Sequence, residues 1–112
     1  MKLVKNGEGV EYNAPGHLNC FVMNKLVFGG KDTKNINIGM SYFLPGGGAE
    51  MGAAPVERVY CVISGSIEVK GKNEKYLLTD GDLIYIGDGE EREFKVLGNF
   101  PATIMVVAAK PV

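Results

Sequence analysis

Hydrophobic and polar side chains alternate along most of this chain in short runs, and each run is bounded by Gly, Pro, Asn or Asp. No segment keeps apolar side chains at the i, i+3, i+4, i+7 spacing of an amphipathic helix. Alternation with a period of two is typical of a half-buried β-strand. The pattern therefore predicts strands at residues 18–28, 36–44, 58–63, 66–70, 75–78, 83–86, 93–97 and 102–109.

Turn-forming residues separate the predicted strands. Pro45-Gly46-Gly47-Gly48 is expected to end the strand at 36–44, residues 71–74 to form a hairpin, and residues 79–82 to form a tight turn. Closely spaced strands with no helix between them indicate an all-β sandwich or barrel.

The aromatic and methionine residues inside these strands are expected to form the core or wall of the barrel. They are Met40, Tyr42, Phe43, Tyr85, Phe94 and Met105. A chain of 112 residues is long enough to bury one such core without disulfides or metals. We therefore expect residues 1–112 to form one domain, in which residues 1 to about 17 are an arm that adds an edge strand.

Composition excludes several classes of partner. The net charge is −1, so no basic surface is available for nucleic acid. No apolar run approaches the ~20 residues of a membrane span, and the first residues lack the apolar stretch of a signal peptide. A cytoplasmic location is the expectation that follows.

Cys20 and Cys61 have no CxxC spacing and are expected to be free, buried or half-buried thiols.

Two stretches of the chain resemble the two sequence motifs of the cupin superfamily. They are residues 45–65 and residues 81–96. The strand-turn-strand sequence at 59–69 and the segment at 81–86 carry most of the resemblance. The resemblance covers about residues 36–108. It implies a double-stranded β-helix, or jelly-roll barrel, that is usually a homodimer.

The residues at the metal-binding positions of this family are different here. Its ligands are two histidines and a glutamate from the first motif and a histidine from the second. Counting back six residues from Gly65 places Arg58 at the glutamate position, and a shift of one residue places Glu57 there. No histidine lies at residues 51–54, and the second-motif histidine position holds Arg92. We therefore expect no metal cofactor of the usual kind.

Arginine changes the chemistry expected of the barrel. A guanidinium stays protonated and offers only donors, so it repels a cation and binds carboxylate, phosphate or enolate oxygens. Arg58 and Tyr60 share one face of their predicted strand, because side chains alternate along a strand. If that face is internal, then Arg58, Tyr60 and Arg92, with Glu50 nearby, line a ligand-binding cavity. The alternatives are that Arg58 forms a structural ion pair with Glu57 or Glu91 near the rim, and that Arg92 lies in a solvated, charged turn.

His17, the only histidine, lies outside both motifs. It titrates near neutral pH, so His17, Glu57 and Tyr60 are the candidate catalytic acid–base groups. An atypical divalent-metal site formed by His17, Glu50 and Glu57 is the alternative for the same residues. The third reading places all three on the solvated surface.

Three functions therefore stay open from the sequence. The first is a small-molecule-binding cupin that holds an anionic metabolite in its barrel, either as a sensor or as an isomerase, cyclase or lyase. The second is a metalloenzyme with atypical ligands. The third is a non-catalytic, dimeric structural or accessory barrel.

Overall fold

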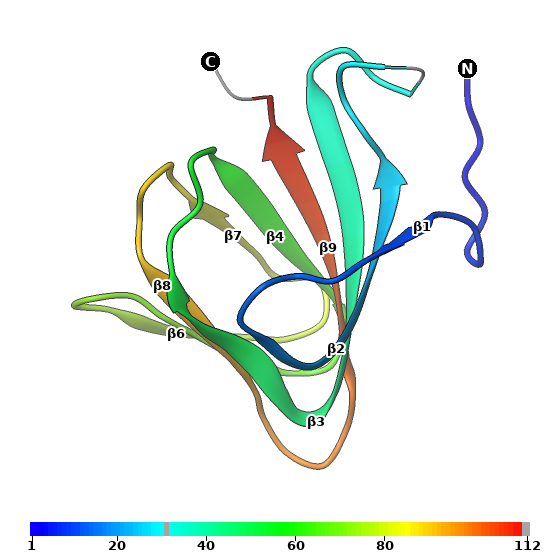
Figure 1. The fold of residues 1–112 in the computed structure, drawn as a ribbon. Helices are drawn as coiled ribbons and strands as arrows, with labels where there is room; N and C mark the ends of the chain where they lie inside the picture. Colours follow the sequence, from blue (N-terminus) through cyan, green and yellow to red (C-terminus); the bar gives the residue numbers. More distant parts are fainter. Residues whose placement is uncertain (31, 111–112) are drawn as a thin grey trace.

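The computed structural model describes residues 1–30 and 32–110, and this part of the chain forms nine β-strands (Figure 1). The all-β prediction is confirmed. The strands are β1 (Val10–Tyr12), β2 (His17–Leu26), β3 (Ile36–Gly52), β4 (Arg58–Ser64), β5 (Ile67–Lys70), β6 (Lys75–Leu78), β7 (Leu83–Ile86), β8 (Arg92–Val96) and β9 (Ala102–Ala109). The described residues include no helix long and apolar enough to cross a membrane.

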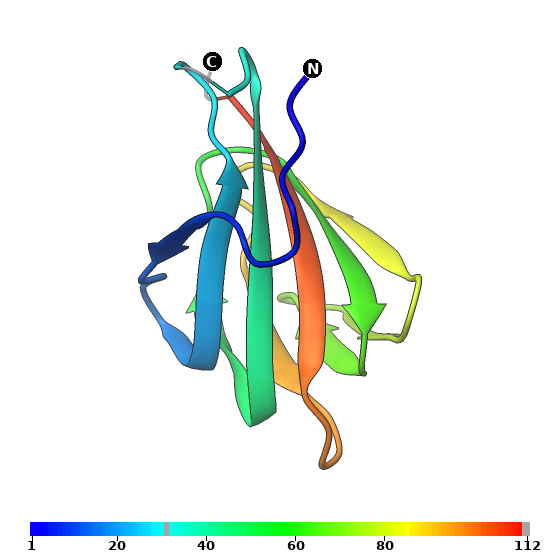
Figure 2. The same cartoon turned by 90° about the vertical axis from the view of Figure 1, so that its right-hand side faces the viewer.

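Hydrogen bonding joins the strands in the order β6-β5-β8-β3-β9-β4-β7, with β2 on β3 and β1 on β2. All of these pairs are antiparallel. The path curls into a barrel whose two ends, β6 and β7, are not hydrogen-bonded to each other. One wall consists of β2, β3, β9, β4 and β7 and the other of β6, β5 and β8 (Figures 1 and 2).

Strand β3 contributes to both walls, and this corrects the expected strand end at Pro45. Residues Ile36 to Phe43 pair with β9, whereas Gly48 to Gly52 pair with β8. Gly46 has a φ of 78°, which favours glycine. A Cβ on Gly48 would lie 2.2 Å from the carbonyl oxygen of Phe94, so only glycine lets the two strands approach this closely. The glycine run is therefore the bend by which one strand crosses between walls.

The core lies between the two walls and is formed by the inward half of each alternating strand. Its most buried large side chains are Val62, Ile67 and Ile104. Phe43 and Phe94 belong to this core, as predicted. Tyr85 does not, because it is 58% exposed, and the partly exposed Met40, Tyr42 and Met105 alternate with buried neighbours and so face outwards.

The N-terminal arm adds an edge strand, as expected. Val10 to Tyr12 pair antiparallel with Val22 to Asn24 of β2. The Lys25 ammonium then fixes the preceding turn by donating to the carbonyl oxygens of Asn6 and Glu8. The arm and the segment after β1 pass across the open side of the barrel before β2 begins (Figure 1).

Candidate active site

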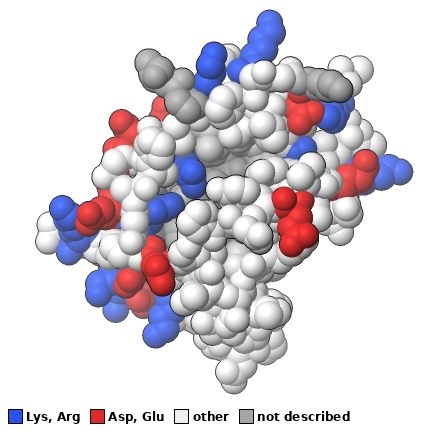
Figure 3. All heavy atoms as spheres, viewed as in Figure 1, with Lys and Arg blue, Asp and Glu red and all other residues white. Residues whose placement is uncertain are grey.

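A cavity of about 330 Å³ lies inside the barrel. Its polar lining comes from β2, β3 and β4, and includes Asn24, Asn37, Ser41, Arg58 and Tyr60. On the space-filling surface, Lys or Arg side chains border a hollow near the middle of this face (Figure 3). The cavity volume lies at the lower end of the range for small-molecule sites.

Two guanidinium groups meet at the hydroxyl oxygen of Tyr60; Arg58 and Tyr60 line this cavity, whereas Arg92 does not. Alternation along β4 directs both Arg58 and Tyr60 inwards, and Tyr60 is only 6% exposed. Arg92, the first residue of β8, donates from Nη2 to the Tyr60 hydroxyl oxygen at 3.0 Å and from Nη1 to the carbonyl oxygen of Gly52 at 2.7 Å. Arg58 reaches the same phenolic oxygen from Nη1 at 3.5 Å.

Aromatic rings support the Arg92 guanidinium. Its central carbon lies 5.6 Å from the ring centroid of Phe94 and 5.9 Å from that of Tyr60. The two rings contact each other at 4.7 Å between centroids. Because a cation is attracted to an aromatic face, this packing fixes the guanidinium without a carboxylate.

No ion pair with a described residue offsets the positive charge at this point. Arg58 and Arg92 are the only arginines in the sequence, and neither forms an ion pair with a described residue. The barrel cavity itself has no Asp or Glu among its described lining residues. The Arg58 Nε atom is buried and has no hydrogen-bond acceptor. A buried donor without a partner costs free energy, so the site is incomplete as the chain alone forms it.

His17 lies on the wall of the same cavity, at the start of β2. Its ring stacks on Phe43 with 6.1 Å between centroids and an interplanar angle of 15°. Its Nδ1 is 3.0 Å from the carbonyl oxygen of Pro15. Since a carbonyl only accepts, Nδ1 carries the proton of this hydrogen bond.

The two candidate carboxylates lie elsewhere. Glu50 and Glu57 are exposed, and neither lines the barrel cavity. Glu57 accepts a hydrogen bond from the Tyr85 hydroxyl at 3.0 Å, and this bond, more than any other contact, raises the pKa of Tyr85. The structure thus brings together Arg58, Tyr60, Arg92 and the wall that carries His17, but it does not bring Glu50 or Glu57 to them.

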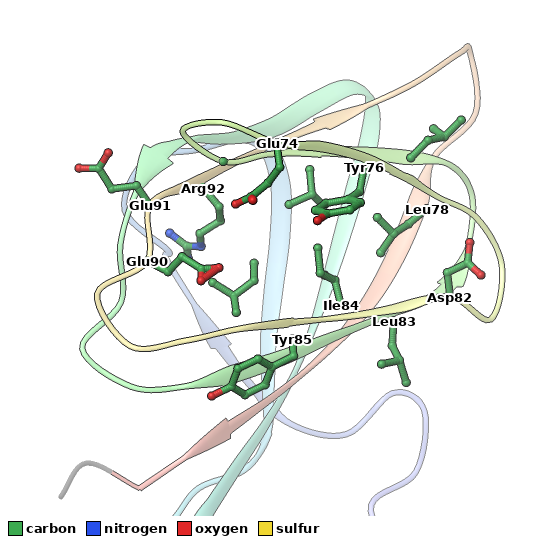
Figure 4. A pocket seen from close by; sticks show the side chains of 14 residues that line it. Glu74, Tyr76, Leu78, Asp82, Leu83, Ile84, Tyr85, Glu90, Glu91 and Arg92 are labelled. Atoms are coloured by element: carbon green, nitrogen blue, oxygen red, sulfur yellow. The ribbon is translucent and has the colours of Figure 1, made fainter.

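A second pocket, the side cleft, opens where β6 and β7 leave the barrel unclosed. It has a volume of about 520 Å³ and is lined by residues of β5 to β8 and the turn before β8. Glu74 and Glu90 point from opposite sides towards Arg92, whereas Glu91 points away (Figure 4). Arg92 therefore lies between the side cleft and the phenolic oxygen of the barrel cavity.

Comparison with known proteins identifies the family. Residues 39–108, more than half of the chain, match the family model of the cupin domain. The chain is a member of the cupin family. This cupin is 29% identical over 112 residues to a protein named Beta-D-galactosidase Rv1717, from Mycobacterium tuberculosis, and the match covers 100% of this chain and 97% of that protein.

Solved structures show the same fold. The polyketide cyclase RemF from Streptomyces resistomycificus superposes with a TM-score of 0.81 at 18% identity, over 97% of this cupin and 79% of that chain. KdgF from Halomonas sp. superposes with a TM-score of 0.77 at 16% identity, over 99% and 95% respectively. The predicted jelly-roll architecture is confirmed by these neighbours and by the strand order.

The metal that the cupin fold suggests does not fit the side chains of this chain. The expected glutamate and histidine positions hold Arg58 and Arg92, whose guanidiniums converge on one oxygen and cannot act as ligands. Across residues 1–30 and 32–110, no three His, Cys, Asp or Glu side chains are grouped to hold an ion. In particular, His17, Glu50 and Glu57 do not form such a group.

Part of the cavity wall was not anticipated from the motifs. Asn24, Asn37 and Ser41 face inwards on strands whose other face is apolar. The available signal in β3 was the alternation of small or polar residues at positions 37, 39 and 41 with hydrophobic residues at positions 36, 38, 40 and 42. It was ambiguous because the sequence does not say which face of a strand is internal. Glu74 and Glu90 had no signal, since they lie in turns that looked solvated.

Proposed function

We propose that this cupin binds a small metabolite in its barrel through an anionic oxygen group that Arg58, Arg92 and Tyr60 hold. The observation that carries the proposal is the buried Arg58 Nε, which has no acceptor within the described residues. A carboxylate, phosphate or enolate oxygen supplies that acceptor and offsets the two unpaired positive charges.

The hydrogen-bond capacity of Tyr60 supports the same class of ligand. Its oxygen faces N–H donors from both arginines, so its two lone pairs are engaged and its own proton is free to be donated. This end of the cavity therefore presents donors only. A ligand atom that only accepts, as an anionic oxygen does, is the complementary partner.

The remainder of the cavity is neutral. Asn24, Asn37 and Ser41 provide amide and hydroxyl groups, and His17 provides its imidazole ring. A ligand anchored at Arg58 thus meets uncharged hydrogen-bonding groups with its other end. In a catalytic version, Tyr60 donates a proton to the ligand and His17, on β2 of the same wall, accepts one.

Binding of simple anions tests the proposal. Acetate, malonate and inorganic phosphate are titrated into the protein, with binding heat and thermal stability as the readouts. We expect at least one anion to bind and to stabilise the wild type, because a ligand at 100 times its Kd contributes about 2.7 kcal/mol. Arg58→Met should abolish this effect, whereas Lys95→Met, which removes one exposed positive charge from β8, should leave it unchanged.

Two results would contradict the proposal. One is equal anion binding by Arg58→Met and the wild type. The other is no binding of any of the three anions at millimolar concentration, since each supplies the acceptor that Arg58 lacks.

A second candidate is hydrolysis of a β-galactoside in the side cleft. Glycoside hydrolysis generally uses two carboxyl groups on either side of the scissile bond. Glu74 and Glu90 point into the side cleft from opposite sides (Figure 4), and the Mycobacterium tuberculosis relative is named a galactosidase. Hydrolysis of a chromogenic β-galactoside that is lost in both Glu74→Gln and Glu90→Gln, but retained in Glu91→Gln, would favour this candidate over binding in the barrel.

A further inference from the structure

The inward-facing residues of four neighbouring strands form three rows across the barrel, and these rows set the chemistry of the cavity wall. The first row consists of Arg58, Ala108 and Asn37, the second of Tyr60, Val106, Gly39 and Asn24, and the third of Val62, Ile104, Ser41 and Val22. The β4 end of the first two rows is polar, the β9 position of every row is apolar, and every row has a polar side chain on β3 or β2.

The two polar sides of the cavity differ in their hydrogen-bonding capacity. The β4 side presents donors, from Arg58 and Tyr60. On the other side, the Asn24 amide and the Ser41 hydroxyl form no hydrogen bond with any described residue, and each of them can both donate and accept. Asn37 accepts from the Phe28 N–H through Oδ1 at 2.7 Å, which leaves its Nδ2 to donate. The β2–β3 side is therefore complementary to groups that both donate and accept, as hydroxyl groups do.

The β9 strand between the two sides provides an apolar floor. Arg58 and Asn37 lie two strand spacings apart, roughly 10 Å between backbones, and only the small Ala108 separates them in their row. Gly39 likewise leaves room in the second row, because even a Cβ there would lie 3.5 Å from the Asn24 Oδ1. A ligand can thus lie across β9, with one end at Arg58 and the other at the amides.

A ligand without hydroxyl groups does not suit this wall. An alkyl or aryl acid in the cavity would displace water from Asn24, Asn37 and Ser41 and supply nothing in its place. Polar groups that lose water without gaining a partner cost free energy. Hydroxyl groups replace the water at all three side chains, while their carbon skeleton covers the apolar floor.

The size of the cavity limits the length of the ligand. About 330 Å³ corresponds to roughly eleven waters at ~30 Å³ each, which suits a ligand of about a dozen non-hydrogen atoms. We infer that the ligand is a polyhydroxylated carboxylate of about six carbons, an inference that rests on the proposed function. Arg58 and Tyr60 hold its carboxylate. Its hydroxyl groups bind to Asn24, Asn37 and Ser41.

Four probes separate the carboxylate from the hydroxyl groups. Gluconate and glucuronate carry both, hexanoate has the carboxylate and the chain length without hydroxyls, and sorbitol has the hydroxyls without a charge. Each is titrated calorimetrically into the full chain, with acetate as the reference anion. The variants are Ser41→Ala and Asn24→Ala, and Asn73→Ala, in the exposed turn between β5 and β6, is the matched control. Far-ultraviolet circular dichroism shows whether each variant folds.

We expect gluconate or glucuronate to bind at least about tenfold more tightly than hexanoate, because several hydrogen bonds to the wall add to the one anchor. Ser41→Ala and Asn24→Ala should each lower the ratio of this affinity to that for acetate by about fivefold, whereas Asn73→Ala should keep the wild-type ratio. If one wall variant does not fold, the other and the wild-type comparison decide.

The outcomes separate this inference from the proposed function. If acetate or hexanoate binds but neither hydroxy acid binds more tightly than hexanoate, the inference is wrong and anion binding stands. The inference is also wrong if Ser41→Ala and Asn24→Ala, both folded, keep the wild-type ratio. If no anion binds, or if sorbitol binds as tightly as gluconate, the anionic anchor is wrong and the proposed function fails with it.

Discussion

Arg92 donates to the Tyr60 hydroxyl oxygen at 3.0 Å, and Arg58, on the same strand as Tyr60, approaches that oxygen at 3.5 Å. Three strands, β5, β6 and β7, separate the arginines in sequence, yet the barrel brings the only two guanidiniums of the chain to one phenol. The rings of Tyr60 and Phe94 and the carbonyl oxygen of Gly52 support Arg92, whereas Nε of Arg58 is left without an acceptor.

Tyr60→Phe should destabilise the protein without a change of fold. The substitution keeps the ring contact with Phe94 but removes the acceptor of Arg92, and a lost hydrogen bond to a charged group costs about 1.5–3 kcal/mol. Urea unfolding of the wild type and the variant measures this difference. Tyr76→Phe, at an exposed ring of the side cleft, is the control and should change the free energy of unfolding little.

Arg58→Met should stabilise the ligand-free protein. A flexible apolar side chain of similar length removes a partly buried charge and an unsatisfied donor, and we expect a gain of about 1 kcal/mol in the free energy of unfolding. In saturating anion the order should reverse, because only the wild type is stabilised by the ligand. A variant that is less stable than the wild type in the absence of ligand would show that Arg58 has a structural role instead.

Cys20 should react with alkylating reagents only at high pH. Burial raises the pKa of its thiol from 9.0 to about 11. In a Cys61→Ser variant, the alkylation rate should rise with a midpoint near pH 11 for the folded chain, and near 9 in urea. Between about pH 9 and pH 11 the thiol of the folded chain is therefore still protonated, whereas that of the unfolded chain is deprotonated. The free energy of unfolding should fall across this range. A folded midpoint near 9 would contradict this.

Gly48→Ala should be strongly destabilising. The added methyl would lie 2.2 Å from the Phe94 carbonyl oxygen, at the point where β3 crosses from one wall to the other. Separation of β3 from β8 disturbs the ladder beside Arg92, and a loss of more than about 3 kcal/mol is expected. Gly30→Ala, where a methyl meets no atom within 4 Å, is the matched control and should be close to neutral in thermal unfolding.

The metal content of the purified protein distinguishes the proposed anion-binding cupin from the metalloenzyme alternative. We expect protein purified without chelator to contain far less than one equivalent of iron, manganese, nickel or zinc by mass spectrometry, because two guanidiniums replace the ligands. His17→Ala should leave the metal content unchanged. One equivalent of metal that His17→Ala removes would establish an atypical centre.

The sequence determined the secondary structure and the fold family, because both depend on local pattern. Alternation with a period of two predicted the strands, and the motif text at 59–69 and 81–86 indicated the barrel before any coordinates were known. The resemblance also placed Arg92 at one ligand position of the family, and Arg58 or Glu57 at another. Each of these inferences needs only residue spacing within one strand or turn.

Only the tertiary structure decided which faces of the strands are internal. Met40, Tyr42 and Met105 were expected in the core or wall of the barrel, and the structure places them on the outer side of the wall, while the polar Asn24, Asn37 and Ser41 line the cavity. When the outer face of a strand is apolar, the local sequence does not show which face is internal. A one-residue shift in register exchanges the two faces. The meeting of Arg58 and Arg92 on Tyr60, and the separation of Glu50 and Glu57 from them, likewise depend on the strand register around the barrel, which no segment of the sequence specifies alone.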